Sequence, residues 1–173
     1  MLNSADFVFA RIGLWSIGAA PAMINYHLTG QALVYCLKVS RVEIMLIDGD
    51  EAALRRMEDV KAEVQSLRYL MLREARRKLA DFSSEAPTDE LRKGVQGGDQ
   101  MALFYTSGTT KRLHATDDGS IRAWLWQYVC MPYYHGTGGI NAMAQLVANS
   151  TLLIAPKFSV SSFWPDIIQS RAT

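Results

Sequence analysis

The sequence predicts an α/β fold with a mostly parallel sheet and flanking helices. Short apolar runs typical of buried strands alternate with longer segments whose apolar residues recur at helical spacing. Of the 173 residues, 49% are hydrophobic and 20% are charged, a balance that indicates a folded domain and excludes a disordered chain. The formal net charge of +1 gives no reason to expect a nucleic-acid partner.

The first predicted helix begins after Ser4, because serine is a common N-cap and apolar residues at helical spacing follow it over residues 7–15. Gly18 ends this helix, and residues 19–25 are expected to form a short buried strand. The apolar start of the chain is broken by Gly18 and by charged Arg11, so it indicates a core helix and not a membrane span.

A second helix is expected at residues 31–39, opened by Thr29 and carrying leucine and valine at helical spacing. The apolar run at residues 42–47 predicts a strand, and the Asp-Gly-Asp sequence at 48–50 predicts the turn that ends it.

The charged stretch at residues 51–78 predicts a long helix, which includes residues 51–62. Two alternatives remain for residues 67–72, which either continue that helix or form a strand. The mixed acidic and basic side chains of residues 51–78 indicate a solvated face, not a nucleic-acid surface. Residues 83–99 are polar and contain proline and glycine, so they predict a loop.

The second half continues the alternation of strands and helices. We expect strands at residues 101–105, 124–131 and 151–155, a helix at residues 140–147 and another from residue 161 onward. Trp164 is expected in the core with the other tryptophans of this half.

A hydroxyl-rich cluster follows the strand predicted at residues 101–105. It consists of Thr106, Ser107, Gly108, Thr109 and Thr110. Several backbone N–H groups and four hydroxyls in one tight loop suit a polyanion such as a triphosphate. Gly108 permits a positive φ angle and a close approach of the ligand. An ordinary turn is the alternative interpretation.

The string Tyr-Thr-Ser-Gly-Thr-Thr at residues 105–110 resembles the phosphate-binding loop of the AMP-forming acyl-activating enzymes, also called adenylate-forming enzymes. It lacks the spacing of a Walker loop. Three further segments look like the branch that contains the fatty acid transport proteins and very-long-chain acyl-CoA synthetases. They lie at residues 15–40, at residues 131–138, and at residues 157–159 together with 163–166.

The resemblance implies the function of a fatty acyl-CoA synthetase, which activates a carboxylate to acyl-AMP and then forms a CoA thioester. It implies ATP and Mg²⁺ as cofactors and fatty acid and CoA as partners. The hydroxyl-rich cluster would bind the ATP phosphates, and Tyr134, His135 and Gly136 would line the acyl or adenylate pocket. The resemblance also implies an intracellular location, either peroxisomal, at the endoplasmic reticulum or otherwise associated with a membrane. No catalytic residue and no metal ligand is assigned to this chain.

Two departures from the family pattern limit that implication. The family's Gly-Leu-Pro-Lys continuation is replaced by Lys111, Arg112, Leu113 and His114, and the stretch between Thr110 and His135 is shorter by about the length of a helix. Residues 110–123 are therefore expected to form a poorly ordered loop.

The second departure is that residues 1–173 match only part of the N-terminal AMP-binding domain. The family's metal- and adenine-binding segments and the C-terminal domain with its catalytic lysine have no counterpart. We expect an incomplete sheet and an inactive, poorly soluble chain. The alternatives are a non-catalytic nucleotide- or acyl-binding remnant and a protein-interaction module.

Overall fold

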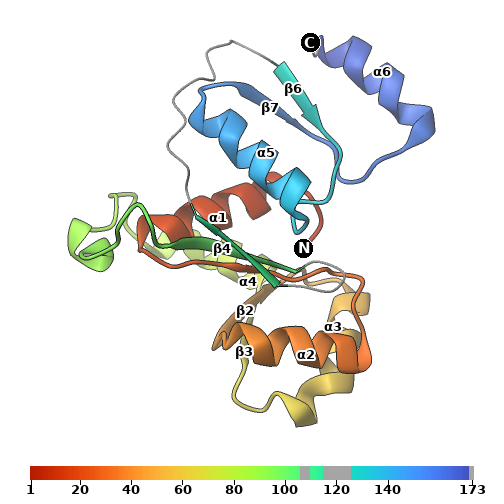
Figure 1. Cartoon of the computed structure of the whole chain (residues 1–173). Helices are drawn as coiled ribbons and strands as arrows, with labels where there is room; N and C mark the ends of the chain where they lie inside the picture. The colour runs from red at the N-terminus through yellow and green to blue at the C-terminus, as the bar shows by residue number, and fades with distance from the viewer. Residues whose placement is uncertain (106–109, 115–125, 172–173) are drawn as a thin grey trace.

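The computed structural model describes residues 1–105, 110–114 and 126–171, with the backbone alone for residues 110–114 and 126. Helices and strands alternate along most of the chain (Figure 1). The α-helices are α1 (Ala5–Ser16), α2 (Gly30–Ser40), α3 (Glu51–Val60), α4 (Leu72–Lys78), α5 (Gly136–Val147) and α6 (Val160–Ser170). The strands are β1 (Ala22–Met23), β2 (Ile44–Ile47), β3 (Arg68–Met71), β4 (Gln100–Tyr105), β5 (Thr110–His114), β6 (Trp126–Val129) and β7 (Thr151–Ile154). Three short 3₁₀ helices, Lys61–Glu63, Leu79–Asp81 and Asp89–Arg92, complete the described elements.

The described strands form three small sheets with the orders β1-β4-β5, β2-β3 and β6-β7. Every pair is parallel except β4 with β5, which are antiparallel. The predicted α/β class with mostly parallel strands is therefore confirmed, and so are the strands predicted at residues 42–47, 101–105 and 151–155.

Helix caps follow the sequence pattern closely. Ser4 Oγ accepts a hydrogen bond from Phe7 N at 3.2 Å and starts α1, as predicted. Asp50 Oδ1 accepts from Ala53 N at 2.7 Å and starts α3 directly after the turn that ends β2. These side chains satisfy N–H groups that have no partner within the helix, which fixes where each helix begins.

The stretch at residues 51–78 is not one helix. A 3₁₀ turn follows α3, and β3 then pairs with β2 through all four of its residues before α4 begins. The strand alternative for residues 67–72 is correct, because β2 finds in β3 the parallel partner that its backbone groups need.

Two other expectations are wrong. Residues 110–114 form β5 and not a loop, because the backbone of β4 pairs with them along most of its length; residues 115–123 lie outside the described part of the chain. Trp164 is 65% exposed on α6 and does not belong to the core.

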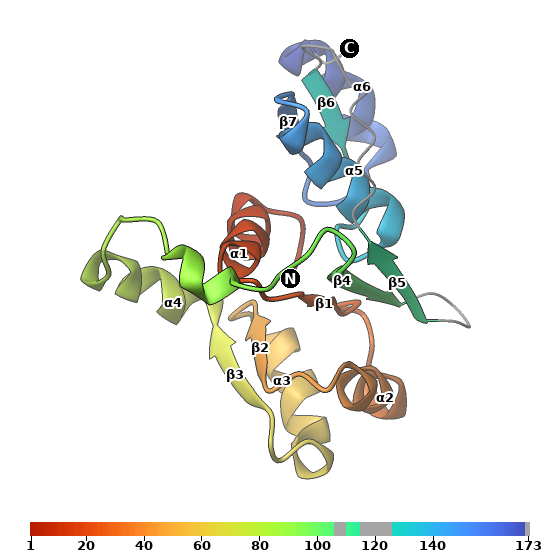
Figure 2. The same cartoon turned by 60° about the vertical axis from the view of Figure 1, so that its left-hand side comes forward.

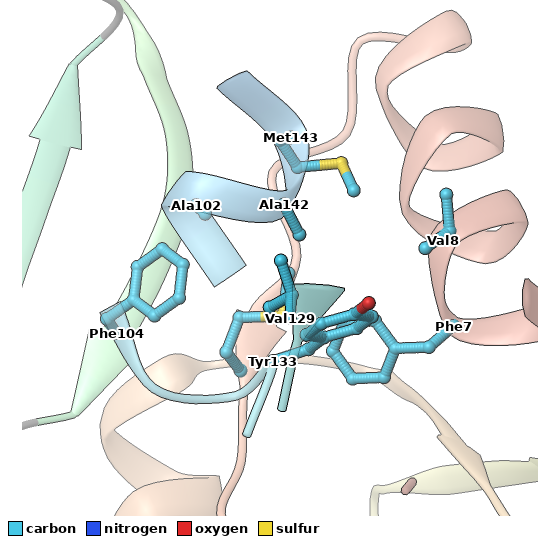
Figure 3. Packing of buried hydrophobic residues seen from close by; sticks show 9 residues of the cluster. Phe7, Val8, Ala102, Phe104, Val129, Tyr133, Ala142 and Met143 are labelled. Atoms are coloured by element: carbon cyan, nitrogen blue, oxygen red, sulfur yellow. The ribbon is translucent and has the colours of Figure 1, made fainter. Parts of the chain in front are cut away.

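The larger core cluster joins the start of the chain to its second half (Figure 3). Phe7 and Val8 of α1 pack with Ala102 and Phe104 of β4 and with residues of β6 and α5, and the ring of Tyr133 meets Phe7 edge-on with centroids 5.6 Å apart. A second cluster lies between α2, α3 and β2 and contains Leu33, Val34, Leu37, Ile47, Met57 and Val60.

The side chain of Asn3 connects the start of the chain to residues 131–155 by hydrogen bonds. Its side-chain Nδ2 donates to the carbonyls of Met131 (2.9 Å) and Ala155 (3.0 Å), and its Oδ1 accepts from Tyr133 N at 2.8 Å. Asn3 is 4% exposed, so its amide is a buried polar group with its hydrogen bonds satisfied.

Candidate functional site

The strands on either side of the hydroxyl-rich cluster, β4 and β5, pair as an antiparallel hairpin. Tyr105 pairs with Thr110, so residues 106–109 connect the two strands. Thr106, Ser107, Gly108 and Thr109 fall outside the described residues, and Thr110 is the first residue of β5. The hairpin is anchored by β4, whose Ala102, Leu103 and Phe104 are buried.

Lys111 and His114, which follow the cluster, pair with opposite ends of β4. Lys111 lies opposite Phe104, one pair from the tip, whereas His114 lies opposite Gln100 at the far end of β4. Lys111 is therefore the cation nearer in register to residues 106–109.

The end of β4 shares an edge with the end of β1, since these strands are parallel. In open α/β sheets ligands bind beyond the carboxyl ends of the strands. Asn25 and Tyr26 follow β1 at this edge, and Tyr105 ends β4 there, with its hydroxyl donating to Cys36 O of α2 at 2.9 Å. Burial raises the pKa of Tyr105 to about 12, so it is a fixed neutral donor at physiological pH.

The second predicted site segment reaches the same edge. The ring of Tyr134 meets that of Tyr26 edge-on, with centroids 5.2 Å apart. His135 is exposed and caps α5, because its Nδ1 accepts from Thr137 N at 3.3 Å, and Gly136 is the first residue of that helix. The structure thus brings Tyr134 and its neighbours to the edge at which residues 106–109 begin.

Glycine lets the start of α5 approach the protein core very closely. A Cβ atom on Gly139 would lie 2.3 Å from Tyr133 O and 3.0 Å from the Phe104 ring. Since a side chain does not fit there, Gly139 sets how close the start of α5 comes to β4.

Sequence reasoning missed Arg11 as part of this region. Arg11 is 3% exposed, its Nη1 donates to Gly139 O at 2.7 Å, and its guanidinium lies over the rings of Trp15 (4.7 Å) and Phe104 (5.4 Å). Burial lowers the pKa of Arg11 to about 10. The available signal was a charge within an apolar helix, and the structure shows that this charge links α1, β4 and the start of α5.

Among the described residues, no group of three or more His, Cys, Asp or Glu could hold a metal ion. The residues assigned to the site are hydroxyls, backbone amides and aromatic rings, which suit phosphate oxygens and an apolar ligand better than a metal ion. Within the same described part, none of the helices combines the length and apolar character needed to cross a membrane.

Comparison with protein families finds one model that spans the whole chain. Residues 1–173 match the family described as AMP-binding enzyme. The match includes the candidate phosphate cluster and the Tyr134 segment.

Two curated relatives cover nearly all of this chain. Isopenicillin N epimerase component 1 of Hapsidospora chrysogena is 33% identical over 173 residues, which is 100% of this chain and 26% of that protein. The very long-chain fatty acid transport protein of Saccharomyces cerevisiae is 29% identical over 201 residues, which is 99% of this chain and 29% of that protein. The chain therefore spans less than a third of the length of either relative.

The alignment with the yeast protein is longer than the 173 residues of this chain, so the yeast protein contains residues with no counterpart here. The alignment with isopenicillin N epimerase component 1 is 173 residues long, so the expected shortening is seen against the yeast protein and not against this relative. The position of the shortening, between Thr110 and His135, stays a prediction.

Solved structures share the fold. The N-terminal domain of FACL13 from Mycobacterium tuberculosis superimposes with a TM-score of 0.84 and 18% identity, over 99% of this chain and 46% of that chain. The O-succinylbenzoate coenzyme A synthetase MenE of Bacillus subtilis, solved with ATP and magnesium ion, gives 0.74 and 19% identity over 99% of this chain and 47% of that chain.

Proposed function

Because this chain belongs to the family of AMP-binding enzymes, we propose that it forms the part of an ATP-dependent fatty acyl-CoA synthetase that holds the ATP phosphates and one wall of the acyl-adenylate pocket. The observation that supports this most strongly is the meeting of three segments at one sheet edge. These are the last described pair of the β4–β5 hairpin, Tyr105 with Thr110, then Tyr26 after β1, and Tyr134, whose ring packs on that of Tyr26.

In the proposed reaction a carboxylate oxygen attacks the α-phosphorus of ATP, forming the acyl-phosphate bond as the bond to pyrophosphate breaks. Backbone N–H groups of residues 106–109 and the hydroxyls of Thr106, Ser107 and Thr109 would donate hydrogen bonds to the phosphate oxygens. Mg²⁺ would neutralise phosphate charge when bound with ATP, and we assign it no ligand in this chain. In this proposal Tyr134 would contact the acyl-adenylate through its ring, and His135 and Gly136 would line the pocket beside it.

We also propose that this chain does not complete the reaction alone. The family's motif lysine is replaced by His114, and the nearer cation, Lys111, stands where the family has glycine. Loss of a fixed positive charge weakens the stabilisation of developing negative charge, which is usually the largest contribution to such catalysis.

The test measures binding of MgATP to the full chain by equilibrium dialysis, alongside fatty-acid-dependent release of pyrophosphate. We expect weak binding that falls about a hundredfold or more in the Ser107→Ala/Thr109→Ala variant, because each of the two lost hydrogen bonds to a charged group is worth about 1.5 kcal/mol or more. Restoring the glycine and the lysine of the family motif with Lys111→Gly/His114→Lys should tighten binding, whereas Gln169→Lys, at an exposed position on α6, should not.

Binding that is insensitive to the loop variants would remove the support for a phosphate site. Robust pyrophosphate release by the unaltered chain would contradict the proposal that it is inactive.

Isopenicillin N is a second candidate for the acid, because the relative named for its epimerisation is 33% identical over this whole chain. Equilibrium dialysis of labelled palmitate and labelled isopenicillin N, each with and without MgATP, separates the two. Retention of isopenicillin N alone would favour the second candidate.

A further inference from the structure

An open hollow of about 430 Å³ lies beyond the carboxyl ends of β2 and β3. Asp48 and Gly49 follow β2 directly and line one part of it, residues of α4 line another, and Asp6 of α1 also contributes. Figure 2 shows α1 and α4 beyond the arrowheads of these two strands. The residues that line this α4 hollow are all different from those of the candidate phosphate and acyl site.

Three arginines of α4, Arg73, Arg76 and Arg77, line the hollow. Residues three and four positions apart lie on the same face of a helix, so Arg76 and Arg77 are both neighbours of Arg73. Like charges at this spacing repel each other and destabilise a helix. Neither Arg73 nor Arg77 forms an ion pair with any of the described residues. An anion bound between the three guanidinium groups would replace their repulsion by attraction.

The two acidic residues of the hollow already have partners. Asp6 Oδ1 lies 3.4 Å from Arg76 Nε, and Asp48 Oδ2 accepts a hydrogen bond from Leu2 N at 2.9 Å. Because the ion pair uses Nε of Arg76, the two Nη groups of this side chain, which is 65% exposed, stay accessible to a ligand. Three guanidinium groups and two carboxylates leave the hollow with a net positive charge.

We propose that the α4 hollow is a second anion site, in which Arg73, Arg76 and Arg77 bind the phosphate group of a phosphomonoester. This goes beyond the proposed function and does not depend on it, since the two sites share no residue. A phosphomonoester carries a charge of about −1.5 to −2 at neutral pH and three acceptor oxygens, so it can accept from all three guanidinium groups. A carboxylate has one charge and two oxygens, and it matches a single guanidinium fork.

The size of the hollow suits a small phosphorylated molecule, because sites for small molecules commonly measure about 300–1,000 Å³. The same phosphomonoester group occurs in soluble molecules such as glycerol 3-phosphate and in the headgroup of phosphatidic acid. The experiment therefore has one arm for each source.

In the first arm, the full isotope-labelled chain is titrated with glycerol 3-phosphate and its backbone amides are followed by NMR. We expect saturable shifts at Gly49, Arg73 and Arg77, which sodium chloride at equal ionic strength does not reproduce. Because each amide reports its own surroundings, binding at the β4–β5 hairpin is recorded separately. Failure of the proposed function would therefore leave this test intact.

Matched variants test the role of the arginines. Arg73→Gln/Arg77→Gln should weaken binding by about tenfold, a modest loss for two charges because exposed ion pairs are screened by water and salt. Arg92→Gln/Lys93→Gln removes the same amount of charge at exposed positions outside the hollow and should leave binding unchanged.

The Asp6→Asn variant tests the sign of the bound charge. We expect it to bind glycerol 3-phosphate more tightly, because it removes a negative charge from the hollow and releases Nε of Arg76. Weaker binding in this variant would overturn the proposal, since only a cation needs the carboxylate. If Arg73→Gln/Arg77→Gln unfolds α4, the unaltered chain and Asp6→Asn still decide.

In the second arm, the chain is sedimented with phosphatidylcholine vesicles that contain phosphatidic acid or, at equal surface charge, phosphatidylserine. Retention by phosphatidic acid alone would support the site and identify a lipid headgroup as its ligand, whereas NMR shifts without retention would support it with a soluble ligand. Equal retention by both vesicles with no NMR shift at Gly49, Arg73 and Arg77 would overturn the proposal. So would the absence of both signals, or an equal loss of binding in Arg92→Gln/Lys93→Gln.

Discussion

Half-buried Tyr105 and buried Tyr133 differ in one respect that decides the contribution of each hydroxyl to stability. The hydroxyl of Tyr105 donates to Cys36 O at 2.9 Å, whereas the hydroxyl of Tyr133 has no hydrogen-bond partner among the described residues. A buried hydroxyl without a partner costs free energy, and one with a partner adds a modest gain. Aromatic residues of the same shape thus have opposite effects in this protein.

We predict that Tyr133→Phe raises the free energy of unfolding by about 1 kcal/mol at neutral pH and that Tyr105→Phe lowers it by about the same amount. Urea denaturation of the three proteins measures both changes. Equal effects of the two substitutions would show that the Tyr133 hydroxyl finds a partner in solution.

The same tyrosines predict an alkaline loss of stability. Burial raises the pKa of each to about 12, from 10.0 in the unfolded chain. Their contribution is therefore complete below pH 10 and is lost as the pH rises from 10 to 12, because the unfolded chain releases these protons first. Tyr133→Phe should make this loss shallower when urea denaturation is repeated across that range.

At the scale of elements, the seating of α5 on β4 depends on glycine. A Cβ atom on Gly139 would meet Tyr133 O at 2.3 Å, and backbone cannot move aside as a flexible side chain can. Gly13 in α1 is exposed, and a Cβ atom there meets nothing within 4 Å. Substituting Gly139 and Gly13 by alanine therefore makes a matched pair. Each places an alanine within a helix, with a steric conflict at Gly139 and without one at Gly13.

We predict that Gly139→Ala destabilises the chain by about 2 kcal/mol or more through overpacking, and that Gly13→Ala stabilises it by about 1 kcal/mol through helix propensity. Thermal unfolding followed by circular dichroism checks both. A harmless Gly139→Ala would mean that α5 does not sit against Tyr133 as described.

Strands with a continuous apolar run were predictable from sequence, as β2 and β7 illustrate, because burial leaves a local pattern. Strand β5 was not predictable from the sequence, because its residues Lys111 and Arg112 show no apolar run. It is a strand because its backbone pairs with that of β4. The candidate site could be proposed from the sequence only as two separate motifs. Their convergence through Tyr26 and Tyr134, and the link made by Arg11, depend on contacts distant in sequence.

At the scale of the whole molecule, α6 has one face that nothing in the described chain covers. Val160, Trp164 and Ile168 recur every fourth residue and are 80%, 65% and 74% exposed. On its other side, Asp166 Oδ2 accepts from the Tyr128 hydroxyl at 3.0 Å, which attaches α6 to β6. An exposed apolar stripe of this kind favours association between copies.

We predict that the chain self-associates as its concentration rises and that the Val160→Ser/Ile168→Ser variant does so much less. Gln169→Ser, an exposed position on the same helix, is the control and should change little. Sedimentation velocity over a range of concentrations measures the effect. A monomer at all concentrations would contradict the prediction.

The hydrogen bonds of Asn3 impose an order on biosynthesis. Asn3 emerges from the ribosome before one of its acceptors, Ala155 O, which is separated from it by 152 positions. At ordinary translation rates, the interval between the two is on the order of ten seconds. During that time α1 exists without β6, β7 and α5, and its Phe7 and Val8 face water or a chaperone. The nascent chain therefore completes this core only after residue 155 has been made.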